Sequence, residues 1–574
     1  MVRSAAAQTN PVSGRANALW GRGGRRASAL AATVLCALGA AAAAAGAPGQ
    51  PAAAGAFVQP ALLDSIAQGA APSYDVIVET SDRKVTGAGF LKKVGLSSAQ
   101  LRRQFQSVNG DELKLTGPQI LALAKTKYVA AIVPNEQVEM SAVELPRSNA
   151  QKWAWVTHAP VDWTTQSLAL DTPTIAIVDS GVAGSRFGGR LLGQATFVSS
   201  GTNSPGDGYG HGTFVAGVAA GGEDGLAGVA PNANLLSLDV MNDDGVATVA
   251  DVIAACDWIL ENKDAYDIRV ANFSLHAANR ASLFFDPLDL AVERLWQNGV
   301  VVVAASGNYA VDGAESGVEY APGNDPFVIT VGATDVNDTV DTSDDVAAPF
   351  SAWGYTPDGF AKPDLAAPGR YLIGPVPPGS GLTQERPDHV IGGDTMQLSG
   401  TSFAAPAVAG AAALILARHP DWTPDQVKGA LLDTAEPLPA ATPRSVGAGE
   451  LDVAAARADE APSNPNAALD AFLAPDGSFD SAAWQAAAAA DAAWGDAAWS
   501  DAAWASAAWG DAAWSDAAWG DAAWGDAAWS DAAWADAAKD SPLGLPATLL
   551  TNGQIGQLEQ QLGIANPDTD PTAN

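Results

Sequence analysis

Three short segments, far apart in the chain, each place a reactive or titratable side chain beside small residues. Asp179 ends the apolar run Ile-Ala-Ile-Val and precedes Ser-Gly, His211 stands in Gly-His-Gly-Thr, and Ser402 stands in Gly-Thr-Ser-Phe-Ala-Ala-Pro. A serine hydroxyl is a poor nucleophile at neutral pH and needs a neighbouring base. Histidine suits that task because its pKa lies near the working pH, and a buried carboxylate fixes its tautomer. The set predicts nucleophilic catalysis by Ser402, with His211 as the base and Asp179 as the group that orients it.

The elements that must hold these residues are predicted by apolar strands alternating with Ala-rich helices. Continuous Val/Ile strands separated by helices indicate a parallel sheet covered on both faces. Ligands of such sheets bind beyond the carboxyl ends of the strands, where Asp179 lies. The expected strands are 174–178, 234–240, 270–273, 300–304 and 327–331, and the expected helices follow His211 and cover 248–262, 289–297 and 403–418.

A fourth segment, Val-Val-Val-Ala-Ala-Ser-Gly-Asn ending at Asn308, completes a set of motifs. In their order Asp, His, Ser, the four resemble the subtilisin-like serine peptidases, the subtilase family. The resemblance covers about 300 residues and implies a secreted serine endopeptidase with a three-layer α/β fold, a parallel sheet flanked by helices. It also implies that the Asn308 side chain and the Ser402 backbone N–H bind the oxyanion, and that Ser274, Leu275 and Gly307 contact an extended polypeptide substrate. A catalytically inactive scaffold is disfavoured because no motif residue is missing.

The charge balance excludes one class of partner. The 574-residue chain has 30 Lys and Arg against 64 Asp and Glu, a formal net charge of −34. Nucleic-acid binding needs basic surface to displace counterions from phosphates, so no nucleic-acid partner is expected. The 2 cysteines exclude a disulfide scaffold and a Cys-rich zinc module. Cys256, in an apolar helical pattern, is expected to be a buried thiol.

The N-terminal residues read as an export signal. Residues 1–63 contain arginines and no acidic residue, and the arginines lead into the Ala-rich apolar run 27–47. This order predicts a cleaved signal peptide, residues 1–47, and an extracellular protein. About 20 apolar residues can span a bilayer, so an uncleaved membrane anchor is the alternative, disfavoured because alanine is weakly hydrophobic. The Ala/Pro/Gly-rich residues 48–73 are expected to form a linker.

Residues 74–142 are predicted to be a small α+β domain. The pattern indicates a strand from Tyr74, a helix running from 97 through 105, paired strands between 105 and 115, a helix after Thr116 and a strand at 129–133. The unit resembles the inhibitor-type propeptide of subtilases, which implies a folding template and inhibitor of its own enzyme. Self-cleavage is expected between Met140 and Lys152, near Ala142, leaving 143–457 as the peptidase domain.

The C-terminal region has a different composition. We expect a linker at 458–490, Asp-Ala-Ala-Trp pentad repeats at 491–538 and a polar tail at 539–574. Neither a helix nor a strand collects tryptophans spaced by five residues on one face, so a disordered low-complexity segment is favoured. Its rings could bind glycans or cell-wall polymer and hold the protein at a surface; a spacer without a partner is the alternative. The tail as the functional binding module, with the peptidase domain as its delivery device, is a second hypothesis.

The chemistry predicted here needs no cofactor. Structural calcium is compatible with Asp-rich loops such as 242–245, because carboxylate and carbonyl oxygens are the ligands that calcium prefers. Such a loop is more often a plain solvated turn. The sequence therefore names no metal ligand, and the metal sites stay unknown.

Overall fold

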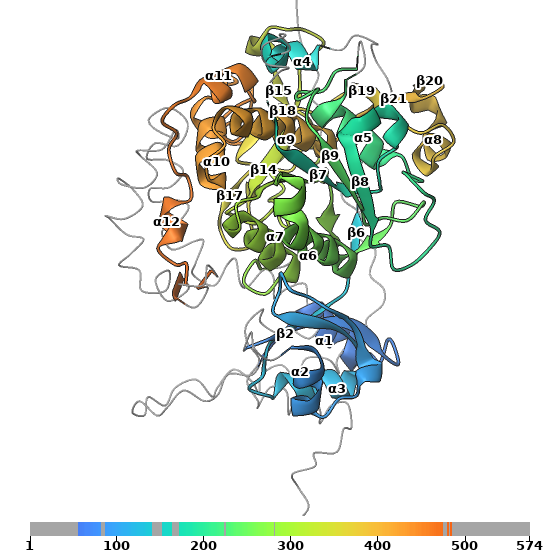
Figure 1. The fold of residues 1–574 in the computed structure, drawn as a ribbon. Coiled ribbons are helices and arrows are strands. Elements are labelled where there is room, and N and C mark those ends of the chain that lie inside the picture. Colours follow the sequence, from blue (N-terminus) through green and yellow to red (C-terminus); the bar gives the residue numbers. More distant parts are fainter. Residues whose placement is uncertain are drawn as a thin grey trace, which may run out of the picture. The chain divides into compact units, whose positions relative to one another are not determined.

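The computed structural model describes residues 56–81, 86–139, 152–162, 171–222, 226–280, 282–474, 479–480 and 483–484 (Figure 1). The predicted signal peptide, the predicted cleavage region, the pentad repeats and the polar tail lie outside the described residues.

An eight-stranded sheet forms the centre of the peptidase domain, in the order β15-β14-β13-β11-β7-β9-β8, with β18 also pairing with β14. All neighbours are parallel except β15, which runs antiparallel to β14. Every residue of β7 and β13 is buried, as expected for strands covered on both faces. The strands are β7 (Thr174–Asp179), β8 (Leu191–Thr196), β9 (Leu235–Asp239), β11 (Ile268–Phe273), β13 (Val301–Ala305), β14 (Ile329–Asp335), β15 (Val346–Ala347) and β18 (Leu365–Pro368).

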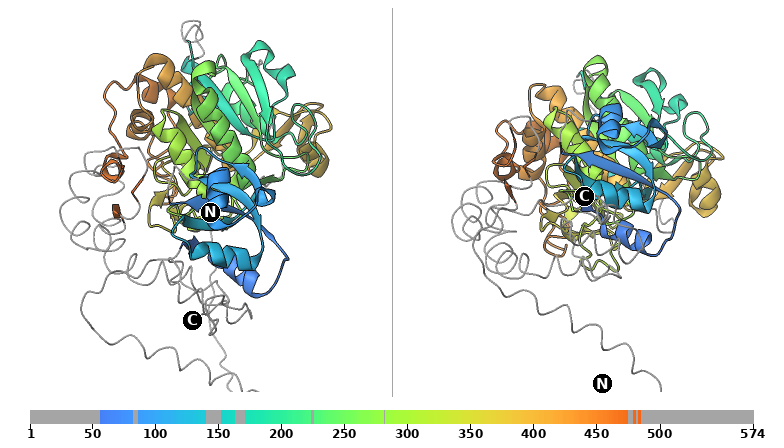
Figure 2. Two further views of the ribbon diagram at one scale, coloured as in Figure 1. Left: turned by 60° about the horizontal axis from the view of Figure 1, so that its bottom comes forward. Right: turned by 90° about the horizontal axis from the view of Figure 1, so that it is seen from below.

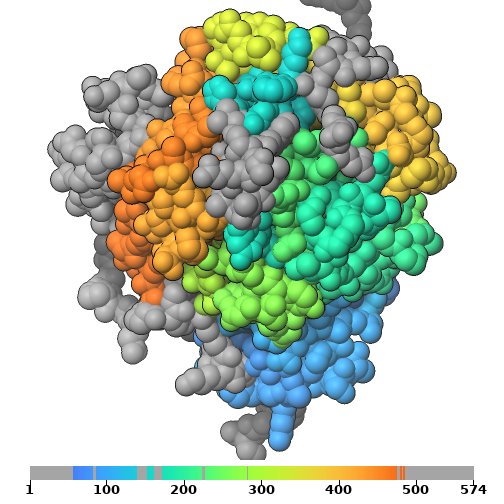
Figure 3. All heavy atoms as spheres, turned by 45° about the horizontal axis from the view of Figure 1, so that its top comes forward, coloured from blue at the N-terminus to red at the C-terminus, as the bar shows by residue number. Residues whose placement is uncertain are grey.

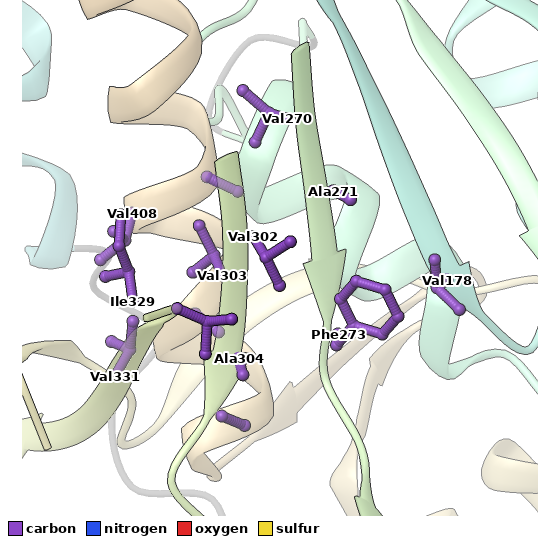
Figure 4. Packing of buried hydrophobic residues seen from close by; sticks show 14 of the residues in the cluster. Val178, Val270, Ala271, Phe273, Val302, Val303, Ala304, Ile329, Val331 and Val408 are labelled. Carbon is purple, nitrogen blue, oxygen red and sulfur yellow. The ribbon is translucent and has the colours of Figure 1, made fainter. Parts of the chain in front are cut away.

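Helices complete the three layers and confirm the predicted fold class. The main ones are α5 (His211–Ala220), α6 (Val249–Tyr266), α7 (Pro287–Gln297), α9 (Thr401–Arg418), α10 (Pro424–Asp433) and α11 (Val453–Ala458). α6 and α7 pack together on β7, β11 and β13, whereas α9 packs on β11, β13, β14 and β18 and against α5. Figure 4 shows Val408 of α9 beside Ile329 and Val331 of β14.

Two features of these helices bear on the sequence analysis. Among the described helices, α9 has the length and apolarity of a membrane span, 18 residues with a mean hydropathy of 1.4, and 89% of it is buried inside the protein. Cys256 on α6 is buried and free, as expected. Burial raises the pKa of its thiol well above the usual value.

Short elements surround the sheet. They are α4 (Trp153–Val156), β10 (Ala247–Thr248), β12 (His276–Ala277), β16 (Gly354–Tyr355), β17 (Ala361–Lys362), β19 (Leu372–Pro375), α8 (Gly381–Glu385), β20 (Val390–Gly392) and β21 (Thr395–Leu398). β19, β20 and β21 form one small antiparallel sheet, and β16 pairs with β17.

The N-terminal domain has its own five-stranded sheet, in the order β1-β5-β2-β4-β3, and its own apolar core. Its elements are β1 (Phe57–Val58), α1 (Pro60–Ala67), β2 (Tyr74–Thr80), α2 (Gly87–Val94), β3 (Leu101–Gln104), β4 (Gly110–Leu115), α3 (Gly117–Ala124) and β5 (Val129–Pro134). β1 pairs with β5, so the residues expected as a linker at 48–73 include part of this domain. The helix expected through 97–105 is wrong, because only Ser98–Gln100 is helical there and β3 follows it.

A single strand, β6 (Gln137–Glu139), leaves the small domain and lies between two edges of the peptidase domain. It pairs antiparallel with β10 on one side and with β12 on the other. Figure 2 shows the small domain (blue) next to the green helices and strands of the peptidase domain.

The chain after α11 does not behave as the linker expected at 458–490. Its described residues 459–474, 479–480 and 483–484 include α12 (Ala467–Asp470) and lie along the peptidase domain (orange, Figure 3). Asn466, Leu469 and Trp484 are buried. We name these described residues the C-terminal strap.

Candidate active site

The carboxylate and the imidazole predicted to work together are in contact. Asp179 is the last residue of β7 and His211 is the first residue of α5. His211 Nδ1 lies 2.8 Å from Asp179 Oδ1, and both side chains are buried. An ionised carboxylate oxygen only accepts hydrogen bonds, so Nδ1–H donates and Nε2 keeps its lone pair. That tautomer is the one a general base needs.

Ser402 lies at the N-terminal end of α9, as its second residue. α9 packs against α5, and the ring of Phe403 lies 5.2 Å from the imidazole of His211 and 4.4 Å from Phe214. Ser402 Oγ–H donates to the carbonyl oxygen of Ser274 at 3.2 Å. Nε2 of His211 has no hydrogen-bond partner among the described residues. In this structure the Ser402 hydroxyl therefore donates to Ser274 and not to Nε2.

Asn308, predicted to bind the oxyanion, is held by the residue before Ser402. Thr401 N–H donates to Asn308 Oδ1 at 2.8 Å, and Thr401 Oγ1–H donates to the same oxygen at 3.0 Å. Two donors on Oδ1 turn the amide oxygen toward Thr401 and place the amide nitrogen on the opposite side. Gly307 N–H in turn donates to Thr401 Oγ1 at 3.2 Å.

Comparison with known proteins assigns the family. Residues 171–449 match the subtilase family model. Subtilisin E of Bacillus subtilis (strain 168) is 32% identical over 338 residues, 58% of this chain and 78% of that protein. The chain belongs to the subtilase family. Serine protease AprX of the same organism is 38% identical over 297 residues, 50% of this chain and 66% of AprX. Subtilases of this kind are serine endopeptidases, so the chain is assigned to the peptide-bond hydrolases.

A solved structure supports the fold. Fervidolysin from Fervidobacterium pennivorans, a keratinolytic enzyme related to subtilisin, superposes with a TM-score of 0.52 at 22% identity. The match covers 68% of this chain and 61% of fervidolysin. At this identity the similarity establishes the subtilase fold alone.

Asp207 belongs to the site although no sequence motif pointed to it. Its buried carboxylate accepts from Ser180 Oγ–H at 2.9 Å, Gly210 N–H at 2.6 Å, and both the N–H and the hydroxyl of Thr213 at 2.7 Å and 2.5 Å. Burial raises the pKa of Asp207 to about 7, although its four donors act in the opposite direction. Asp207 thereby ties the end of β7 to the start of α5. Its place four residues before His211 is the sequence signal that could have found it.

The three predicted substrate-contact residues differ in what their side chains do. Ser274 is buried; its hydroxyl donates to the Ser402 carbonyl oxygen at 2.7 Å and accepts from Asn272 Nδ2 at 2.9 Å. Leu275 is also buried. Their side chains thus support the site from inside, and the predicted contact with substrate stays a prediction for their backbone groups.

Gly307 has a backbone that no other residue type adopts easily. Its φ is +104°, and a Cβ at this position would lie 2.2 Å from the ring of Tyr309. Tyr309 meets His276 and Tyr320 at ring-centroid distances of 5.9 Å and 5.0 Å. The backbone beside Asn308 is therefore lined by aromatic rings.

The Asp-rich loop 242–245 does not offer a cation site. Asn242 Oδ1 accepts from the N–H groups of Asp244 and Val246, and the Asp243 carboxylate accepts from Ser204 N–H and Oγ–H. These bonds use the side-chain oxygens to close the turn. Within the described ranges, no group of three or more His, Cys, Asp and Glu side chains is arranged around a common point suited to a metal ion.

Proposed function

We propose that this subtilase is a secreted endopeptidase in which Ser402 is the nucleophile, His211 the general base and acid, and Asp179 the group that orients His211. The observation that carries the proposal is the buried 2.8 Å contact of His211 with Asp179 at the start of α5, where the imidazole also lies 5.2 Å from the ring of Phe403 at the start of α9. Convergence of residues 179, 211 and 402 from separate elements is what the three motifs predict.

The proposed reaction proceeds through an acyl-enzyme. Ser402 Oγ attacks the scissile carbonyl carbon while its proton passes to His211 Nε2. The Asn308 amide and the Ser402 backbone N–H donate to the oxyanion. When the tetrahedral intermediate collapses, its C–N bond breaks and His211 gives the proton to the leaving amine. Water then attacks the acyl carbon and gives one proton to His211. The bond from the acyl carbon to Ser402 Oγ breaks, His211 returns the proton to Oγ, and the carboxylic acid leaves.

A covalent serine probe tests these roles. A fluorophosphonate should label the processed protein, and Ser402→Ala should abolish both labelling and peptide hydrolysis. Ser343→Ala is the control, because it removes an exposed serine hydroxyl outside the motifs and leaves Ser402 and its hydrogen bonds in place. Labelling that persists in Ser402→Ala would assign the nucleophile to another residue.

We further propose that the N-terminal domain is a propeptide that blocks the cleft of its own enzyme. β6 pairs with β12, which begins two residues after Ser274, and Ser274 accepts from Ser402 Oγ. Because β6 runs antiparallel to β12, Val138 pairs with Ala277 and Glu139 with His276, so Glu139 is the end of β6 that lies nearer to Ser274 along β12. The proposed cut between Met140 and Lys152 lies just beyond that point.

Processing distinguishes self-cleavage from cleavage by another protease. The Ser402→Ala chain should stay at its unprocessed length, whereas the Ser343→Ala control should mature. Mixing purified Ser402→Ala chain with active enzyme shows whether the cut can also occur between molecules. A normally sized mature band from Ser402→Ala alone in a protease-deficient host rules self-processing out.

We also propose that the protein is secreted and that its pentad repeats hold it at the cell surface by binding cell-wall polymer or glycan. Because the strap packs on the peptidase domain, truncation has to follow Trp484 rather than residue 458. A chain ending at 484 should keep peptidase activity and lose binding to cell-wall polymer or glycan. Unchanged retention of the truncated chain would make the repeats a spacer.

A further inference from the structure

The C-terminal strap is an addition that ends in a buried tryptophan. The family match ends at residue 449, before the strap begins. Asn466 Nδ2 donates to the carbonyl oxygen of Phe327 at 3.1 Å and to Asp425 Oδ1 at 2.7 Å, which attaches the strap at α12. The described strap ends at Trp484, which has no exposed surface. Burial of so large a side chain identifies its surroundings as a formed site.

Aromatic rings surround this tryptophan. Its ring centroid lies 5.1 Å from that of Phe284 and 5.4 Å from that of Phe360. Phe479 of the strap lies 6.1 Å from Phe284 and 5.4 Å from Phe327. Distances of this size are typical of favourable ring pairs. We call Phe284 and Phe360, the two rings that contact Trp484, the Trp484 socket.

The peptidase domain holds both rings of the socket in place independently of the strap. Phe284 follows Leu283, and Phe360 lies two residues after Asp358. The buried Asp358 carboxylate accepts from Ser282 Oγ–H at 2.6 Å and from Leu283 N–H at 2.9 Å. These bonds join the two loops that carry the rings, so the socket does not depend on which tryptophan fills it.

The sequence that ends at Trp484 is repeated downstream. Ser-Ala-Ala-Trp at 481–484 recurs letter for letter at 506–509. Ala-Ala also precedes every repeat tryptophan, at Trp494, Trp499, Trp504, Trp509, Trp514, Trp519, Trp524, Trp529 and Trp534. The backbone N–H of Trp484 donates to the backbone carbonyl oxygen of Asp480 at 3.0 Å. Any residue type at position 480 provides that carbonyl. The side chain that enters the socket and the two small residues before it are thus common to all copies.

We propose that the Trp484 socket is a docking site for Ala-Ala-Trp units, and that the downstream repeats of the same chain are alternative occupants of it. If Trp494 occupies the socket in place of Trp484, the segment that connects the docked tryptophan to Phe479 lengthens from 5 to 15 residues. The entropic cost of closing a loop grows only with the logarithm of its length, so a tethered unit stays at high effective concentration. The repeat array then keeps the strap docked when one unit is lost or engaged elsewhere.

Four full-length chains, all carrying Ser402→Ala to prevent autolysis, test the exchange. They are the parent, Trp484→Ala, a chain with the repeat tryptophans of 494–534 changed to alanine, and the combination of both. Thermal unfolding should show an unchanged midpoint for the repeat variant and a small drop for Trp484→Ala. The combined variant should drop at least twice as far as the two single changes added together. If Trp484→Ala already shows the full drop and the repeat changes add nothing, the repeats do not enter the socket and the proposal is wrong.

A peptide of residues 491–514 provides a direct binding test. It should raise the unfolding midpoint of the combined variant in a saturable manner, and the same peptide with alanine for tryptophan should not. The parent chain, whose socket is filled, should bind the peptide at least tenfold more weakly. Equal binding to both chains, or no binding to the combined variant, contradicts a docking site. Rescue of Trp484→Ala that appears only at concentrations where the chain dimerises would overturn the intrachain arrangement.

Discussion

Backbone placement decides which nitrogen of His211 can act as a base. The Asp179 carboxylate accepts from His211 Nδ1–H through the same oxygen that accepts from Ser180 N–H at 2.8 Å. Ser180 Oγ accepts from Gly212 N–H at 2.9 Å and donates to Asp207. Ser180 and Gly212, the residues that follow Asp179 and His211, are therefore hydrogen-bonded to each other. Rotation of the imidazole away from Asp179 would break this arrangement, which leaves Nε2 as the nitrogen that faces a reacting hydroxyl.

At the residue scale, Thr401 is predicted to be a positioning residue for the oxyanion donor. Thr401→Val removes the hydroxyl that donates to Asn308 Oδ1 and accepts from Gly307 N–H. A less firmly held amide stabilises the transition state less, so kcat should fall about tenfold with little change in KM. Loss of one oxyanion donor in subtilisin, about 10²–10³-fold in kcat, is the upper limit.

The control is Thr401→Ser, which keeps the hydroxyl and loses only a methyl group. Steady-state kinetics on one peptide substrate, corrected by active-site titration, should place Thr401→Ser near the parent enzyme. Equal losses in the valine and serine variants would assign the effect to packing of the methyl group, and the positioning role would be lost.

Motifs located the reactive side chains, but not the groups that support them. Asp179, His211 and Ser402 could be named because their chemistry requires particular residue types beside turns. Asp207 acts through hydrogen bonds with Ser180 and the start of α5, and Thr401 acts through the Asn308 side chain, which is distant in sequence. An aspartate or a threonine near a glycine is common, so residue type alone does not single them out. Ser274 shows the reverse case, because its motif position suggested a cleft wall while its side chain is buried.

At the element scale, the N-terminal domain supplies hydrogen-bond acceptors for the first backbone N–H groups of α6. The first backbone N–H groups of a helix have no partner inside the helix. Val249 N–H donates to the Glu136 carbonyl oxygen at 2.8 Å and Ala250 N–H to Asn135 Oδ1 at 2.9 Å. Arg103 adds an ion pair with Asp251 at 3.2 Å. The domain thus binds the peptidase domain partly by capping one of its helices.

Asn135→Ala is expected to release the processed N-terminal domain earlier. Loss of a helix-capping side chain costs about 1 kcal/mol, which corresponds to about a fivefold faster release. The measurement is the lag before peptidase activity appears after processing. Asn135→Asp keeps an oxygen acceptor at the helix N-terminus and should show a lag no shorter than the parent. A shortened lag in the aspartate variant as well would mean that the amide nitrogen, rather than the capping oxygen, matters.

Strands and helices of the peptidase domain were predictable because their apolar patterns are long and continuous. β7, β9, β11 and β13 lie within two residues of their predicted positions. The small domain was harder, since its short elements give few repeats of a pattern. Leu101 and Phe105 have helical spacing, but Leu101 is half-buried in a strand that pairs with β4 and Phe105 is buried beyond the end of that strand. Phe57–Val58 is too short to be recognised before its partner β5 is known.

At the scale of the whole chain, the amino-acid composition predicted wrong boundaries at both ends of the folded region. Ala- and Pro-rich stretches were expected to be linkers, yet α1 and the strap are both folded. In each case a few large side chains anchor a small-residue segment, such as Phe57, which stacks on Phe285 at 4.1 Å, and Trp484 in its socket. Both anchors contact one turn, Leu283–Asp286. Averages over a window of residues conceal single anchors of this kind.

Buried carboxyl groups meet where the small domain contacts that turn. Burial, reinforced by Asp286, raises the pKa of Glu79 to about 8. Burial also raises the pKa of Asp286 to about 7, with Glu136 and Asp325 adding repulsion. Burial raises the pKa of Glu136, although Asn279 and Gln59 donate to it. The basic group facing Asp325 is Lys362, which is itself paired with Asp364 at 2.6 Å.

These shifts predict that the unprocessed chain loses stability in alkaline solution. A carboxyl group whose pKa is raised by docking binds extra protons in the docked state, so its contribution is complete below about pH 4.5 and is lost as pH rises through 7 to 8. The thermal midpoint of the Ser402→Ala chain should therefore fall between pH 6 and pH 9. Glu79→Gln, which cannot ionise, should show a smaller fall, whereas the exposed Asp312→Asn should match the parent. A fall of the same size in Glu79→Gln would assign the pH dependence to groups outside this contact.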